Sequence, residues 1–268
     1  MRMTIQLVIV FMILLMGVAE AKDAKYSSSR YKYIGIFDKA DRTQVLETSM
    51  GLGTMRKIIK KRWNQGYDID RIKYASGAWI AVFKKSTRKS HQATIVARRW
   101  DHVKLQLDSY WKEGYYITDI EHGLSEWFVI FEKGTGYTAQ SFERRSNLDA
   151  FSKAVHKRWK MGYDLIDMEY GEMGYTGIFV KGSKLKRQAL SIRSYWHDVA
   201  EKIDDYWKEG YRVTDLEYMR GTWVTLFSKY KNEKVQGFET AADIEQFKAI
   251  FKKRQKDGYM LTDLAEGW

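Results

Sequence analysis

A short phrase ending in Gly-Tyr occurs five times in the chain, always at the same interval. Its glycines are Gly66, Gly114, Gly162, Gly210 and Gly258, so each lies 48 residues after the one before. A fixed interval of about 20–50 residues is typical of architectures in which one supersecondary unit stacks on the next, because a single unit cannot bury its own apolar face. The repeat therefore limits the fold to stacked units, as in a solenoid or a propeller.

Each copy predicts three strands followed by a helix. The run Ile117–Ile120 after Gly-Tyr, a turn, and the aromatic-rich run Trp127–Phe131 together predict a β-hairpin. A third strand is expected after the turn that follows, beginning at a glutamine. Apolar residues then recur at helical spacing, as at Phe151, Val155 and Trp159, which predicts an amphipathic helix.

The ends of the expected helices carry capping residues. Asp101, Asn147 and Asp243 are predicted as N-caps, and the five repeat glycines are predicted to end the helices in the left-handed conformation. Tryptophans near the helix ends are expected to pack each helix onto its sheet, and Gln255 replaces this residue in the fifth copy. The expected structural tryptophans are Trp63, Trp111, Trp159 and Trp207.

We therefore predict an α+β fold of five tandem 48-residue β-β-β-α repeats, in a single domain over residues 31–268. The segment Tyr31–Lys39 reads as the second strand of a unit, and the segment Tyr259–Leu264 reads as a first strand. One unit divided between the two terminal segments favours a closed propeller-like ring, because the shared unit leaves no exposed sheet edge. An open α/β solenoid is the alternative.

Residues 1–21 are predicted to be a secretory signal peptide. Arg2 precedes the apolar run Ile5–Met16, and Ala19-Glu20-Ala21 fits a cleavage site. Residues 22–30 are expected to form a flexible segment, and the mature chain is expected to be a monomer without a transmembrane segment. The signal peptide predicts a periplasmic or secreted protein. The chain has no cysteine and no N-x-S/T sequon, which fits a bacterial periplasm or medium better than a eukaryotic secretory route.

The net charge of +12 favours an anionic partner, such as an anionic polymer or an acidic glycan. Charge that serves only solubility is the alternative. Besides the Gly-Tyr phrase, a lysine and a glutamine recur in all five copies, and these are the candidate ligand-binding residues. The lysines, expected on one rim, are Lys39, Lys85, Lys133, Lys181 and Lys229, and the glutamines are Gln44, Gln92, Gln140, Gln188 and Gln236. The alternatives are a solvated turn residue for each lysine and an amide that satisfies strand backbone for each glutamine.

No catalytic, metal-binding or cofactor-binding motif occurs in the sequence. The five histidines lack metal-ligand spacing, and cysteine chemistry is excluded. Four copies carry an aspartate at one strand position where the first copy has Arg71. These aspartates are Asp119, Asp167, Asp215 and Asp263. Such a set could hold a cation or act as acid and base, but an aspartate that bonds its own turn is the favoured reading.

The third copy resembles a known repeat. Lys133–Phe142, with the sequence KGTGYTAQSF, and His156–Tyr163, with the sequence HKRWKMGY, resemble the K-G-T-x-Y-T-x-Q-S-F and W-x-x-G-Y repeat region behind the catalytic domain of plant casein-kinase-1-like kinases. Similar repeats occur in exported bacterial proteins of unknown function. The resemblance extends over residues 31–268 and implies a non-kinase repeat domain, because the glycine-rich loop and the H-R-D and D-F-G motifs of kinases are missing.

These observations predict an exported, non-enzymatic binding or scaffold protein with a basic rim that takes an anionic polymer, an acidic glycan or a partner protein. One alternative is an enzyme that acts on an envelope polymer from the centre of the ring. The other is a purely structural or assembly protein whose positive charge is incidental.

Overall fold

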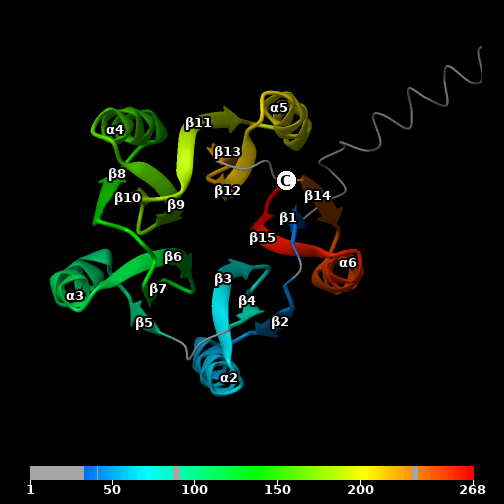
Figure 1. The fold of residues 1–268 in the computed structure, drawn as a ribbon, viewed down its shortest axis with the longest axis horizontal. Coiled ribbons are helices and arrows are strands. Elements are labelled where there is room, and N and C mark those ends of the chain that lie inside the picture. The colour runs from blue at the N-terminus through cyan, green and yellow to red at the C-terminus, as the bar shows by residue number, and fades with distance from the viewer. Residues whose placement is uncertain (1–32, 41, 87–90, 231–234) are drawn as a thin grey trace, which may run out of the picture.

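The computed structural model describes residues 33–40, 42–86, 91–230 and 235–268. The predicted signal peptide and the segment 22–30 lie outside these residues. The described part contains five helices and five three-stranded sheets arranged around a common centre (Figure 1). None of these helices is long and apolar enough to cross a membrane.

The elements have nearly constant lengths from one repeat to the next. The helices are α2 (Leu52–Asn64), α3 (Trp100–Lys112), α4 (Leu148–Lys160), α5 (Trp196–Lys208) and α6 (Ile244–Lys256). The strands are β1 (Tyr33–Lys39), β2 (Gln44–Ser49), β3 (Tyr67–Ala75), β4 (Ala78–Lys85), β5 (Gln92–Ala97), β6 (Tyr115–Gly123), β7 (Glu126–Lys133), β8 (Ala139–Arg145), β9 (Asp164–Gly171), β10 (Gly174–Lys181), β11 (Leu185–Arg193), β12 (Arg212–Met219), β13 (Thr222–Tyr230), β14 (Gln236–Ala241) and β15 (Tyr259–Glu266).

The α+β class and the order of three strands and a helix in each repeat are confirmed. The strand pairing adds a feature that the periodicity does not give. The strand that begins at the glutamine pairs with the next hairpin and not with the hairpin before it, so β5 joins β7 and β6 in one sheet. The structural unit is therefore an outer strand, a helix, an inner strand and a central strand, in that order.

One sheet is assembled from both terminal segments of the described chain. Its central strand is β1, which lies between β14 and β15 and is antiparallel to both. The pairs include Tyr33 with Ala241 on one side and Lys39 with Tyr259 on the other. The expected sharing of one unit between these segments is thus present in the strand pairing.

The inner strands lie side by side around the centre. Contacts join β3 to β6, β6 to β9, β9 to β12, β12 to β15, and β15 to β3. In Figure 1 the helices lie outside the sheets, away from this centre.

The core extends both under the helices and between neighbouring sheets. In one unit, Val199 and Ile203 of α5 pack against Phe227 of β13. Between units, Phe128 of β7 packs with Trp79 of β4. Because successive side chains of a strand point to opposite faces, each central strand serves its own helix with one face and a neighbouring sheet with the other.

Two of the three predicted N-caps are confirmed. Asn147 and Asp243 accept hydrogen bonds from backbone amides three residues on, each at 2.8 Å. The prediction for Asp101 is wrong, because α3 begins at Trp100 and its N-cap is Arg99. Glu172 from the next unit accepts from the Trp100 amide at 2.6 Å, so a neighbouring carboxylate supplies the cap instead.

Candidate functional site

The five recurring lysines contact the Gly-Tyr corners of the repeat. Each ammonium lies 4.3 to 4.7 Å from the centre of a tyrosine ring, in a cation–π arrangement. The pairs are Lys39–Tyr259, Lys85–Tyr67, Lys133–Tyr115, Lys181–Tyr163 and Lys229–Tyr211. Lys39 and Lys85 also donate to carbonyls at helix C-termini, at 2.6 and 2.8 Å. These contacts give the lysines a structural role within each unit.

The recurring glutamines join neighbouring units. The side chain of Gln140 on β8 accepts from the Ile117 amide and donates to the Ile117 carbonyl, both at 2.8 Å, and it also accepts from the Trp111 indole at 3.0 Å. Gln92, Gln188 and Gln236 make the same three bonds to the preceding unit. The glutamine amides thus satisfy the backbone of a strand, which is the alternative role predicted for them. The indoles that donate to them at these junctions are partly buried and belong to Trp63, Trp111, Trp159 and Trp207.

The fifth junction uses a different pair. Gln44 bonds the Leu261 amide and carbonyl at 2.7 and 2.8 Å, as the other glutamines bond their strands. Gln255 takes the place of the missing tryptophan, because its Nε2 donates to the Gln44 side chain at 3.2 Å and its Oε1 accepts from the Gln44 backbone at 3.1 Å. The substitution of glutamine for tryptophan thus keeps a hydrogen bond at this junction.

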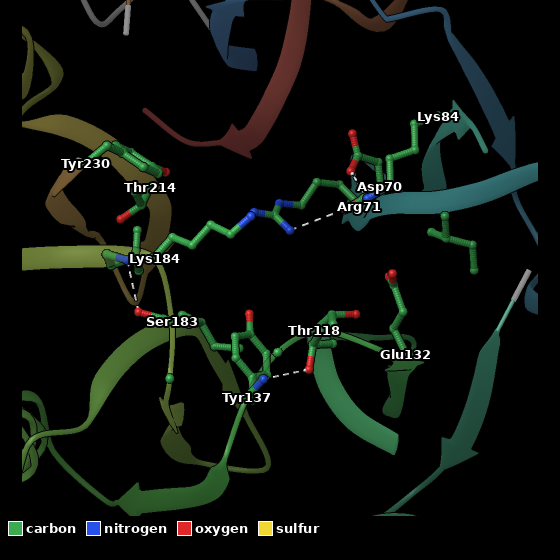
Figure 2. Close-up of a pocket in the computed structure, with 16 residues that line it drawn as sticks. Asp70, Arg71, Lys84, Thr118, Glu132, Tyr137, Ser183, Lys184, Thr214 and Tyr230 are labelled. Carbon is green, nitrogen blue, oxygen red and sulfur yellow. Dashed lines mark hydrogen bonds and ion pairs between the residues drawn. The ribbon is translucent and has the colours of Figure 1, made fainter. Parts of the chain in front are cut away.

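A pocket of about 430 Å³ lies over the beginnings of the inner strands (Figure 2). We call it the central pocket. Its lining includes Arg71, Lys84, Thr118, Tyr137, Lys184 and Tyr230. None of the recurring lysines or glutamines lines it.

Arg71 is the most constrained cation of the central pocket. Its Nε donates to the Thr262 carbonyl at 2.9 Å and its Nη1 to the Asp70 carbonyl at 3.3 Å. Burial alone lowers the pKa of Arg71, but the attraction of Asp119 and Asp263 outweighs burial and raises it, so the guanidinium stays charged. Within the described residues, nothing accepts a hydrogen bond from its Nη2, and 24% of the side chain is exposed.

Lys184 approaches Arg71 from across the pocket. Figure 2 shows the two side chains extending toward one another from opposite sides. The Lys184 ammonium has no hydrogen bond or ion pair to any residue that the structure describes, whereas Lys84 pairs with Asp70 at 2.9 Å. Arg71 lies 3.8 Å from Asp119 and 3.9 Å from Asp263, and Asp70 and Glu132 also line the pocket. The converging ends of Arg71 and Lys184 could together bind an anionic group.

Hydroxyl groups surround this pair of cations. Burial raises the pKa of Tyr137, and burial with the charge of Asp38 raises the pKa of Tyr230 to about 12. Both phenols therefore remain protonated at neutral pH and can donate hydrogen bonds. Thr118, Thr214 and Ser183 add further hydroxyls to the lining.

The recurring aspartates form a buried layer beneath the central pocket and connect neighbouring inner strands. The carboxylate of Asp119 accepts from the Ile72 amide of the preceding unit at 2.7 Å. Equivalent bonds join Asp167 to Ile120 and Asp263 to Leu216, both at 2.6 Å. The expectation that these aspartates bond their own turns is wrong, because they lie within strands β6, β9, β12 and β15. Among the hydrogen bonds of the described residues, Asp263 alone of these aspartates also accepts one from the amide of the next residue in the chain, Leu264.

A smaller pocket of about 190 Å³ lies over the ends of the inner strands. Glu121, Glu169 and Glu217 line it, together with Lys73, whose ammonium contacts Glu217 and lies 3.6 Å from Glu121. One oxygen of each glutamate lies within 4.8 Å of the others, a spacing that could hold a metal ion. Burial raises the pKa of Glu121 to about 7 and that of Glu217 to about 8, although Lys73 lowers both.

The central pocket is not among the sites predicted from the sequence, because the residues that line it are not shared by all copies of the repeat. Arg71 stands where the other four copies have aspartate, so a departure from the repeat is the sequence signal that marks it. Lys184 lies in a connection between strands, where the copies share no pattern, and no sequence signal marks it.

Residues 37–170 match the family model described as "Domain of unknown function (DUF7477)". The match covers 134 of the 268 residues, which is half of the chain. No curated protein matched the chain. The resemblance to the repeat region of plant kinases is not tested by this match and stays a prediction. The extent of the match shows that this chain belongs to the DUF7477 family.

Proposed function

We propose that this chain is a non-enzymatic binding protein that holds an anionic group of an acidic glycan in the central pocket. The observation that carries the proposal is the convergence of Arg71 and Lys184 (Figure 2). Like charges repel more strongly the closer they lie and the lower the local dielectric constant, so a carboxylate placed between the two groups would be stabilised by both. Charge-assisted hydrogen bonds from a guanidinium and an ammonium are the stronger kind in proteins.

The size and the lining of the central pocket support a sugar acid as the ligand. Ligand pockets commonly enclose about 300–1,000 Å³, and the central pocket, at about 430 Å³, falls within this range. Its hydroxyl and phenol groups suit the hydroxyls of a sugar ring, and its cations suit the acid group. Export of the protein, which rests on the predicted signal peptide, would expose this pocket to glycans outside the cytoplasm.

The proposed binding role requires that the five units close into a propeller-like ring, in a single domain over residues 31–268. The position of β1 between β14 and β15 and the contact of β15 with β3 support closure. The central pocket depends on this arrangement, because its lining comes from four of the sheets. An open solenoid would separate the sheets that meet at the pocket.

Calorimetric titration of the mature chain with glucuronate, inorganic phosphate and glucose tests the proposal. We expect glucuronate to bind and glucose to bind far more weakly. Lys184→Gln should weaken glucuronate binding about tenfold, since a hydrogen bond to a charged group contributes about 1.5–3 kcal/mol and 1.4 kcal/mol is a factor of ten. The exposed Lys186 lies two residues away and outside the pocket lining, so Lys186→Gln is the matched control and should bind as the native chain does.

Either of two results would contradict this function. One is the absence of binding to both anions, and the other is equal binding by Lys184→Gln and the native chain. Tighter binding of phosphate than of glucuronate would keep the anion site but replace the sugar acid with a phosphate ester as its ligand.

An enzyme acting on an envelope polymer is the second candidate, and one observation favours it. Glu121 and Glu217 lie close together and their pKa values are raised toward neutral pH, which is common for general acids. Release of reducing ends from an acidic polysaccharide by the native chain, and not by Glu121→Gln, would support catalysis. No release by either chain favours the binding role.

A further inference from the structure

A second basic site lies on the outside of the molecule, along helix α2. A groove of about 560 Å³ runs between α2 and the outer strand β5 of the next unit. Its lining includes Arg56, Lys57, Lys60 and Trp63 from α2 and Thr94 from β5. Figure 1 shows α2 on the periphery, so this groove is separate from the central pocket.

The three cations of the α2 groove are not neutralised by neighbouring acids. Arg56, Lys57 and Lys60 are exposed, and among the described residues none of them forms an ion pair or a hydrogen bond through its side chain. By contrast, Arg62 on the same helix pairs with Glu47. The sequence of α2 contains five basic residues and no acidic residue.

The other copies of the repeat show that the fold does not require these charges. Each unit carries residues at the same three positions, shifted by multiples of 48. In place of Arg56, Lys57 and Lys60 these are Lys104, Leu105 and Asp108 in α3; Ser152, Lys153 and His156 in α4; Ala200, Glu201 and Asp204 in α5; and Lys248, Ala249 and Lys252 in α6. The same site in α5 is therefore acidic, and only α2 has three cations there.

The N-terminus of α2 adds to the positive potential. Each of the other four helices has an acidic residue in its first turn, whereas α2 has none and carries Gly53 where α3 has Asp101. A carboxylate in the first turn offsets the positive end of the helix dipole. Its absence in α2 leaves that end uncompensated, next to the three unpaired cations.

We propose that the α2 groove binds a linear acidic polysaccharide, whose carboxylate or sulfate groups contact Arg56, Lys57 and Lys60. A glycan fits better than a nucleic acid, because proteins that bind single strands stack bases on exposed aromatic faces. The strongly exposed aromatic side chains of the described residues are Tyr195 and Trp268, and neither lines the groove. The indole of Trp63 already donates to Gln92 at 3.2 Å.

Binding of the mature chain to heparin, as a sulfated glycan probe, tests this site across a range of salt concentrations. The variant is Lys57→Glu/Lys60→Glu, and the matched control is Lys252→Glu/Lys253→Glu, which makes the same change in net charge at exposed positions of α6. We expect the α2 variant to lose at least about tenfold in affinity and to show a shallower dependence on salt, because fewer counterions are released. The α6 variant should stay within about threefold of the native chain, since only long-range attraction is reduced.

The outcomes separate this proposal from its rivals. Equal losses in the α2 and α6 variants, or no retention of the native chain, would overturn it, as would tighter binding to a single-stranded oligonucleotide than to heparin. Titration of the α2 variant with glucuronate tests the central pocket separately, because Lys57 and Lys60 lie outside its lining. Retained glucuronate binding with lost heparin binding assigns the loss to the α2 groove, so failure of the central pocket and failure of the α2 groove can be told apart. Circular dichroism of each variant confirms folding, and the acidic residues at the same positions of α5 indicate that the charge changes are tolerated.

Discussion

At the scale of single residues, one glutamine amide at each junction meets the hydrogen-bonding needs of an inner strand, and at four of the five described junctions it also meets those of an indole. The five amides account for the recurrence of glutamine in every copy, since no other neutral side chain of that length both donates and accepts. Each copy of the repeat therefore keeps the glutamine that bonds it to the neighbouring unit.

Gln140→Ala should destabilise the protein strongly. The change leaves the Ile117 amide and carbonyl and the Trp111 indole without their partner. An unsatisfied buried polar group costs about 1–3 kcal/mol, so we expect the free energy of unfolding to fall by at least about 2 kcal/mol. Urea denaturation measures the loss, and Gln106→Ala, on the exposed face of α3, is the control. Equal stabilities of the two variants would show that the junction bond is dispensable.

At the scale of elements, much of the fold could be predicted. The helical spacing of apolar residues, the hairpin pattern and the glycines that end the helices all recur at the same interval. The sheet to which the glutamine-led strand belongs could not be predicted. Alternating apolar residues indicate which strands are half-buried, but they do not distinguish a neighbour in the same repeat from one in the next. Positions shared by all copies do not predict the pocket cations, because Arg71 and Lys184 lie where the copies differ.

Two glycine substitutions should have opposite effects on helix stability. Gly162 follows α4 with φ +76°, where an added Cβ meets no atom but the backbone conformation is unfavourable. Gly162→Ala should therefore cost about 1 kcal/mol. Gly53 lies inside α2 with open space around its Cα, so Gly53→Ala should stabilise by about 0.5–1 kcal/mol. Thermal melts of both variants measure these effects, and a shift of the same sign in both would contradict the assignment of the two conformations.

At the scale of the whole molecule, the centre holds more buried carboxylates than cations. Burial raises the pKa of Asp119 to about 6, of Glu121 to about 7 and of Glu217 to about 8, against the opposing attraction of Arg71 and Lys73. Burial also raises the pKa values of Asp167, Glu169, Asp215 and Asp263. The folded chain therefore binds more protons than the unfolded chain over the pH range between the ordinary and the raised values.

Stability should consequently fall as the pH rises. A group whose pKa is higher in the folded state stabilises it below the unfolded-state pKa and loses this contribution through the folded-state pKa. We expect a lower Tm at pH 9 than at pH 5.5, where outer ion pairs such as Arg158–Glu143 are still formed. Glu169→Gln imitates the protonated carboxyl group and should narrow the difference in Tm between pH 5.5 and pH 9. An equal or higher Tm at pH 9 would show that the central carboxylates are ionised at no cost.

Closure of the ring is the central claim, and the lack of native cysteine makes it directly testable. Lys39 on β1 pairs with Tyr259 on β15, and antiparallel partners have Cα separations of about 4.5–5.5 Å, within the range of disulfides. Mild oxidation of a Lys39→Cys/Tyr259→Cys variant should give a nearly complete intramolecular disulfide. A Lys39→Cys/Tyr163→Cys variant, which uses the matching tyrosine of another unit, should give little. Equal yields in the two variants would show that the terminal strands do not share a sheet, and the closed ring would be rejected.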